Sequence, residues 1–379
     1  MSLETAVSAG SPVITARSGT IRWTDLSGPR LGDVAVGRDN NFNLIRFIAA
    51  SAVLVSHAWP LALGDGTPEP LSAMMGHSLG SMAVFIFFAA SGFFITSSFM
   101  RSNAAVPFLK ARALRLFPGL IVSLVLVALV MGPLTTTLPI GEYLTHHEVW
   151  RFLLDNTLLV NPQFTLPGVF ETNPYPTVEG SIWTLVHEVA CYGLVFLAGM
   201  AGLLGRPRLM AAAIIVYAVL WLLPEFVNLG IPGKLMQTRR LSLPFVMGMA
   251  FWLWRRHIPL SFVLMAVFGL LAWLAVGTRA AFPLLSLSMT YTIFWLAYIP
   301  GGRIREFNRL GDYSYGIYVY AFPLQGLAVW MFGTMTPLTN ILISFPLTLL
   351  CAVLSWRWVE APALAFVHPK KKAGRAQAA

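Results

Sequence analysis

The stretch from Asn43 to Leu63, NLIRFIAASAVLVSHAWPLAL, decides the fold because it is long and apolar yet carries two ionisable side chains. An α-helix crosses a hydrocarbon layer of about 30 Å with roughly 20 residues, so this stretch is long enough to span a membrane. Arg46 and His57 lie on one side of such a helix, about 16 Å apart along its axis. Ionisable groups within a membrane usually mark a functional site. The alternatives are a boundary charge for Arg46 and a hydrogen-bonded packing role for His57.

The composition indicates an integral membrane protein. Of the 379 residues, 56% are hydrophobic and 11% are charged, and the mean hydropathy is +0.69, unlike a soluble domain. The net charge of +10 comes from basic residues in short loops between apolar runs, which favours anionic lipid over nucleic acid as the partner. Cys191 and Cys351 lie inside apolar runs, so we expect packing residues there, not a disulfide or a metal site.

Further apolar runs predict an all-α bundle of about ten transmembrane helices, forming one domain. The expected spans are 43–63, 78–98, 114–135, 181–203, 209–224, 241–254, 259–277, 281–300, 313–332 and 339–358.

The placement of basic residues predicts that both termini are cytoplasmic. When the spans alternate from a cytoplasmic N-terminus, most of the 26 Lys and Arg residues fall inside, and those left outside are Arg151, Lys234, Arg239, Arg240 and Arg279. This bias follows the positive-inside rule. We therefore expect a flexible cytoplasmic tail at 1–40, a transmembrane domain at 41–365 and a basic cytoplasmic tail at 366–379, in a multi-pass protein of the inner (plasma) membrane.

One long connection, residues 136–180, lies on the outside in this topology and contains a helical pattern from His146 to Val160. Loops of this length are commonly functional, so it could line an acceptor site or act as an interfacial cap. The run of His146, His147 and Glu148 does not indicate metal, because adjacent histidines on a helix point about 100° apart.

Two motifs in the next spans carry small or basic residues. In FIFFAASGFFITSSF, Ser91 and Gly92 would let a neighbouring helix or an extended ligand approach closely. In RALRLFP, Arg112 and Arg115 share a helix face, expected next to the amide-rich N-terminus of the third span. Guanidinium groups at such a helix end suit phosphate, although topology alone also demands basic residues there.

The fourth span begins with GSIWTLVHEVACY, which places Glu188 about 10 Å below Ser181. His57 lies about 9 Å below the outer end of the first span, so we expect both side chains at similar depth. A carboxylate there can orient an imidazole as a general base, or the two can form a structural ion pair.

Two further motifs lie towards the C-terminus. In LGDYSYGIYVYAFP, the side chains of Tyr315, Tyr318 and Phe322 form an aromatic stripe typical of a core. In SWRWVEAP, the spacing of Arg357 and Glu360 predicts a local salt bridge.

Six motifs in this order resemble the membrane-bound acyltransferase-3 family over about residues 40–365: R-x10-H, FFAASGFF, RALRLFP, WTLVHE, YSYGIYVYAFP and WRWVEAP. The resemblance implies O-acyl transfer from a cytoplasmic donor, usually acetyl-coenzyme A, to an extracytoplasmic or lipid-linked glycan or a similar hydroxyl-bearing acceptor. Acyl-coenzyme A would be a co-substrate, with no bound cofactor or metal.

The resemblance also implies roles for single residues. His57 matches the essential histidine and Arg46 its paired arginine, while Arg112 and Arg115 match the motif thought to serve the acyl donor. Glu188 matches the acidic residue of the W-S-L-x-x-E pattern, in which Thr184 stands where Ser is usual.

The chain departs from the family at two positions. Asn43 stands where many members carry Asp, and Ala321 stands where the commoner segment has His, so we assign no catalytic weight to the ninth span.

As a mechanism, we expect coenzyme A phosphates at Arg112 and Arg115, with Ser91 and Gly92 beside the donor. His57, oriented by Glu188, then takes the proton of the acceptor hydroxyl or carries the acyl group. Arg46 is too far from His57 to pair with it and would line the donor path. The alternative class of protein is a transporter of a lipid-linked or acidic solute. The lack of a convincing internal repeat in the sequence argues against a transporter. A non-catalytic scaffold or sensor is the third alternative.

Overall fold

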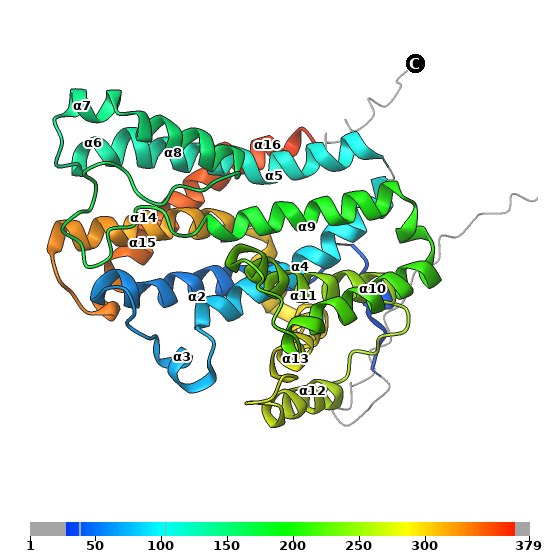
Figure 1. The fold of residues 1–379 in the computed structure, drawn as a ribbon. Coiled ribbons are helices and arrows are strands. Elements are labelled where there is room, and N and C mark those ends of the chain that lie inside the picture. Colours follow the sequence, from blue (N-terminus) through cyan, green and yellow to red (C-terminus); the bar gives the residue numbers. More distant parts are fainter. Residues whose placement is uncertain (1–27, 38, 103, 368–379) are drawn as a thin grey trace, which may run out of the picture.

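The computed structural model describes residues 28–37, 39–102 and 104–367, and within them the chain is helical, with two isolated bridges in place of sheet (Figure 1). A helix occupies each of the ten predicted apolar stretches. They are α2 (Phe42–Leu63), α4 (Leu79–Ser102), α5 (Ala105–Leu126), α9 (Trp183–Met200), α10 (Pro207–Leu222), α11 (Gly233–Leu253), α12 (Phe262–Leu274), α13 (Ala281–Tyr298), α14 (Ser314–Phe332) and α15 (Pro337–Ser355).

Seven helical segments are long and apolar enough to cross a membrane, judged by length and composition over the described residues. They are Phe42–Leu63, Leu79–Ser102, Ala105–Thr135, Trp183–Met200, Pro207–Glu225, Ala281–Tyr298 and Pro337–Ala365, while α12 is a shorter apolar helix. Large apolar side chains stay exposed on these helices, as at Ile215, Val219 and Trp273, which is what a lipid-facing surface requires. The chain is a multi-pass membrane protein; the count of ten spans and the cytoplasmic termini stay predictions.

In two of the predicted spans a π-helical turn joins two α-helices. α5 continues through Val127–Met131 into α6 (Gly132–Thr135), and α15 continues through Trp356–Glu360 into α16 (Ala361–Ala365). A π-helical turn holds an extra residue and rotates the side chains that follow it. The predicted pair of Arg357 and Glu360 is therefore wrong: Arg357 is exposed, while Glu360 is buried and faces α5.

The centre of the bundle is a close contact between α4 and α11. A Cβ atom at Gly92 would lie 1.9 Å from the carbonyl oxygen of Phe245, and one at Gly248 would lie 1.9 Å from that of Ala89. These glycines let the two backbones touch, as in other small-residue contacts between membrane helices.

The connection 136–180 is folded into the bundle. It forms α7 (Ile140–Thr145) and α8 (His147–Leu158), as the helical pattern predicted for the second of these. Beyond α8, Phe170 is fully buried, and the side-chain amide of Asn173 donates to the carbonyl oxygen of Gly326 on α14 at 2.9 Å. Ser181 and Ile182 are also buried, so α9 begins inside the protein and not at its surface.

Part of the predicted N-terminal tail is packed against the bundle. The short helix α1 (Leu31–Val34) buries Leu31 completely, and the Leu31 amide donates to the carbonyl oxygen of Ile258 at 2.8 Å. The folded part therefore begins before residue 41. Residues 1–27 and 368–379 of the two predicted tails lie outside the described residues.

Candidate active site

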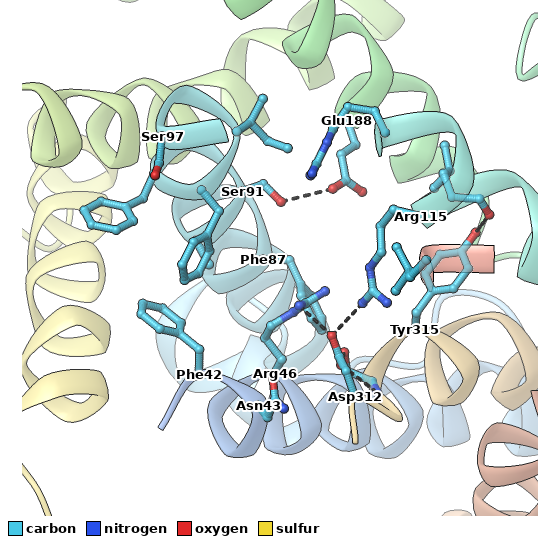
Figure 2. Close-up of a pocket in the computed structure, with 18 of the residues that line it drawn as sticks. Phe42, Asn43, Arg46, Phe87, Ser91, Ser97, Arg115, Glu188, Asp312 and Tyr315 are labelled. Carbon is cyan, nitrogen blue, oxygen red and sulfur yellow. Dashed lines mark hydrogen bonds and ion pairs between the residues drawn. The ribbon is translucent and has the colours of Figure 1, made fainter. Parts of the chain in front are cut away.

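A cavity of about 750 Å³ opens between α2, α4, α5, α9 and the segment that leads into α14 (Figure 2). Its polar lining comes from residues far apart in the sequence and includes Asn43, Arg46, Ser91, Arg101, Arg112, Arg115, Thr184, Glu188, Tyr192, Asp312, Ser314, Tyr315 and Tyr318. Five of the predicted site residues, Arg46, Ser91, Arg112, Arg115 and Glu188, thus line one cavity.

Arg46 and Arg115 meet at one carboxylate. The Oδ2 atom of Asp312 lies 2.7 Å from Nη1 of Arg46 and 2.6 Å from Nη2 of Arg115. Both guanidinium groups approach it from opposite helices (Figure 2). Its other oxygen accepts from the amide and the hydroxyl of Ser314. Burial acts to raise the pKa of Asp312, but the two arginines outweigh it and hold that pKa at about 2.

Arg115 has a second acidic partner. Its Nη1 atom lies 3.5 Å from Oε2 of Glu360, whose other oxygen accepts from the Ser355 hydroxyl at 3.0 Å. The guanidinium carbon also lies 5.8 Å from the centre of the Tyr315 ring. These contacts restrict Arg115 on several sides.

Arg112 lines the same cavity, yet within the described residues it forms no ion pair, and its buried Nε atom has no hydrogen-bond partner. The expectation that this motif sits at a helix N-terminus is wrong. Helix α5 begins at Ala105, about 10 Å before Arg112 along the axis. Pro107 and Phe108 extend the helix beyond the apolar run from which its start was predicted, so guanidinium groups and not backbone amides provide the positive charge.

Glu188 does not pair with His57. It accepts a hydrogen bond from the Ser91 hydroxyl at 3.0 Å and another from the hydroxyl of Tyr192. The predicted depth assumed that α9 starts at the membrane surface. In the structure Glu188 lines the cavity together with the arginines, whereas His57 does not line it.

His57 lies next to the cavity and does not line it. Its ring packs edge-on against Phe322, with 5.1 Å between the ring centres, and its Nδ1 atom is buried with no hydrogen-bond partner among the described residues. Phe322 follows Tyr318 by one turn of α14, and Tyr318 does line the cavity. One helical turn of aromatic side chains therefore separates His57 from the cavity.

Hydrogen bonds hold the side chain of Tyr318, which forms the cavity wall on the side of His57. The Tyr318 hydroxyl donates to the carbonyl oxygen of Ser181 at 2.8 Å and shares a 2.5 Å hydrogen bond with the Thr184 hydroxyl. Phe87 packs edge-on against the same ring at 6.0 Å. The aromatic stripe thus belongs to the cavity wall as well as to the core.

Gly92 is not a cavity residue. Its missing side chain makes room for the backbone of α11. The sequence allowed either a neighbouring helix or an extended ligand to approach Gly92, and in the structure it is a helix. Ser91, its neighbour, does line the cavity and donates to Glu188.

Sequence reasoning missed Asp312, Tyr192 and the long-range role of Glu360. Asp312 stands inside the motif LGDYSYGIYVYAFP, where only the aromatic residues were interpreted. A lone carboxylate directly before an apolar run, predicted on the same side as Arg46 and Arg115, was the available signal.

Residues 39–357 match the acyltransferase-3 family, described as an acyltransferase domain. The chain belongs to the acyltransferase-3 family. This acyltransferase is 28% identical to the O-acetyl transferase of Shigella phage Sf6, over 88% of the present chain and 98% of the phage protein.

A second relative is nodulation protein 10 of Rhizobium leguminosarum bv. viciae, 27% identical over 86% of this acyltransferase and 94% of that protein. No solved structure matches the chain. The family and the phage relative identify the protein as a membrane O-acyltransferase.

Proposed function

We propose that this O-acyltransferase moves an acyl group, most simply acetyl, from cytoplasmic acyl-coenzyme A to a hydroxyl of an extracytoplasmic or lipid-linked glycan. The single observation that carries the proposal is the clustering of Arg46, Arg112 and Arg115 in one cavity of about 750 Å³. Guanidinium groups bind phosphate through charge-assisted hydrogen bonds, and coenzyme A presents phosphates at the end remote from its thioester.

The placement of the lining residues supports a donor whose phosphates lie on the arginine side of the cavity. Arg46 lies in the second turn of α2, whereas Thr184 and Tyr318 lie at the boundary next to His57. A donor whose phosphates bind Arg46 and Arg112 would extend its thioester towards Thr184 and Tyr318. In this proposal Ser91 and Glu188 line the path of the donor's arm.

His57 is the proposed general base. It accepts the proton of the acceptor hydroxyl while that oxygen attacks the thioester carbonyl carbon. The carbon–sulfur bond then breaks, the new ester forms, and the thiolate of coenzyme A leaves and takes up the proton that His57 accepted, which returns His57 to its neutral form. Since Glu188 is hydrogen bonded to Ser91 and Tyr192, we assign it to the donor cavity and no longer to the orientation of His57.

The proposal is tested with purified protein in lipid nanodiscs, radiolabelled acetyl-coenzyme A and membranes that hold the native acceptor. We expect label to enter a glycan or lipid-linked saccharide only when protein and donor are both present. Mass spectrometry of surface glycans from a deletion strain and its parent identifies the modified sugar. Solute accumulation in sealed vesicles without donor, and no labelled glycan, would contradict the proposal and favour a transporter.

A further inference from the structure

Four arginines line the cavity, and three of them, Arg46, Arg112 and Arg115, are held in different ways. Arg46 is bound by Asp312, Arg115 is bound by Asp312 and Glu360, and Arg112 forms no ion pair within the described part of the chain. Two side chains thus have fixed places, and the third keeps its charge available. One residue contacts both of the arginines that are held in place.

Asp312 is that residue. Its Oδ2 atom accepts from both arginines, and Oδ1 accepts from Ser314. With every contact satisfied, the carboxylate cannot rotate without breaking an ion pair. It precedes α14, so the contact ties three segments together at one point, namely α2, α5 and the start of α14.

The charges explain why a carboxylate is needed there. Two guanidinium groups in a half-buried cavity repel each other, since charges are screened poorly away from bulk water. One carboxylate between them compensates this repulsion and fixes their separation. The cavity lining holds four arginines, Arg46, Arg101, Arg112 and Arg115, and two carboxylates, Glu188 and Asp312, so its formal charge is positive.

From this arrangement we infer that Asp312 is a positioning residue of the acyl-donor site, acting through Arg46 and Arg115 on the phosphates of coenzyme A. The inference rests on the proposed function and extends it to a residue that the sequence motifs did not assign. Asp312 remains ionised at every pH at which the enzyme would work, because the two arginines depress its pKa to about 2. The arginine pair is therefore held in place before the donor arrives.

The test is the binding of coenzyme A to the purified full-length protein in nanodiscs, measured by calorimetry for the wild type and for Asp312→Asn. Asparagine keeps the shape of the side chain and removes its charge. We expect the dissociation constant to rise at least tenfold. The matched control is Asp39→Asn, which removes another Asp–Arg contact, to Arg305, outside the cavity, and should leave binding within twofold of the wild type.

A second measurement separates positioning from a general structural role. In membranes that hold the acceptor, Asp312→Asn should raise the KM for acetyl-coenzyme A at least tenfold and change the maximal rate less than threefold. The same variant should lose little activity relative to the wild type with acetyl-pantetheine, which carries the thioester without the phosphates. An equal loss with both donors would overturn the inference.

The outcomes separate the two proposals. If the wild type binds no coenzyme A, the proposed function fails and the inference fails with it. If the wild type binds and Asp312→Asn binds equally well, only the inference fails. Should Asp312→Asn not fold, Ser314→Ala removes the hydroxyl that orients the carboxylate, and a dissociation constant unchanged in that variant would overturn the inference.

Discussion

The ring of His57 packs edge-on against the ring of Phe322, with their centres 5.1 Å apart. This contact places the imidazole one turn of α14 beyond Tyr318, at the end of the cavity away from Arg46. A histidine there can act on a thioester only if the acyl end of the donor reaches the boundary at Tyr318.

The first prediction follows from that position. His57→Ala should abolish acylation, with at least a hundredfold loss expected for a general base, while coenzyme A binding stays within about twofold. Glycan labelling and calorimetry measure the two effects separately. His147→Ala, which alters an exposed histidine on α8, is the control; retained labelling in His57→Ala would refute the catalytic role.

Arg112 should dominate donor affinity among the cavity arginines. Because its guanidinium forms no ion pair within the described residues, replacement by Ala removes a phosphate ligand without breaking an ion pair. We expect weaker coenzyme A binding by about 1.5–3 kcal/mol, the range for a charge-assisted hydrogen bond. Arg208→Ala, at an exposed position on α10, should bind as the wild type does, and equal affinities in both variants would contradict the assignment.

Gly92 should matter for stability and not for the donor. An alanine there would place its Cβ atom 1.9 Å from the carbonyl oxygen of Phe245, so α4 and α11 must separate at a cost of about 1–3 kcal/mol or more. We expect a lower melting temperature in detergent. The control is Gly193→Ala on α9, where an added Cβ atom meets nothing within 4 Å. A stable Gly92→Ala protein with weak donor binding would restore Gly92 to the donor site.

Glu179 should make stability depend on pH. It precedes α9, and burial raises its pKa from 4.5 to about 8 although the Ser181 amide donates to it. The folded protein thus binds a proton that the unfolded chain releases above about pH 4.5, so this contribution to stability falls as pH rises from there to about 8. Glu179→Gln should flatten the dependence of melting temperature over that range. Parallel curves for wild type and variant would show that Glu179 is ionised when folded.

The sequence could predict the helices because apolar length decides them. Each predicted stretch contains a helix, and Arg46, Ser91, Arg112, Arg115 and Glu188 do share one cavity. Depth along a helix could not be predicted, because it depends on where each helix starts relative to its neighbours. Glu188 is hydrogen bonded to Ser91 and Tyr192 in the cavity, whereas His57 packs against Phe322 outside it.

The ion pairs between residues far apart in the chain could not be predicted from the sequence either. Glu360 was assigned to its neighbour Arg357, but the π-helical turn at Trp356–Glu360 changes the local spacing and brings Glu360 to Arg115. Asp312 lies 266 positions from Arg46 and 197 from Arg115, and no periodic pattern connects positions so distant. Only the folded arrangement brings these charges together.

The aromatic residues on α14 have a consequence for the cell as well as for the chemistry. An enzyme that joins reactants from two aqueous compartments would discharge ion gradients if water connected both approaches. The rings of Tyr318 and Phe322 lie between the cavity and His57. The Tyr318 hydroxyl is hydrogen bonded to the carbonyl oxygen of Ser181 and to the hydroxyl of Thr184. In the proposed reaction, an acyl group would therefore cross this barrier by changing its covalent partner, while protons and ions remain on their own sides.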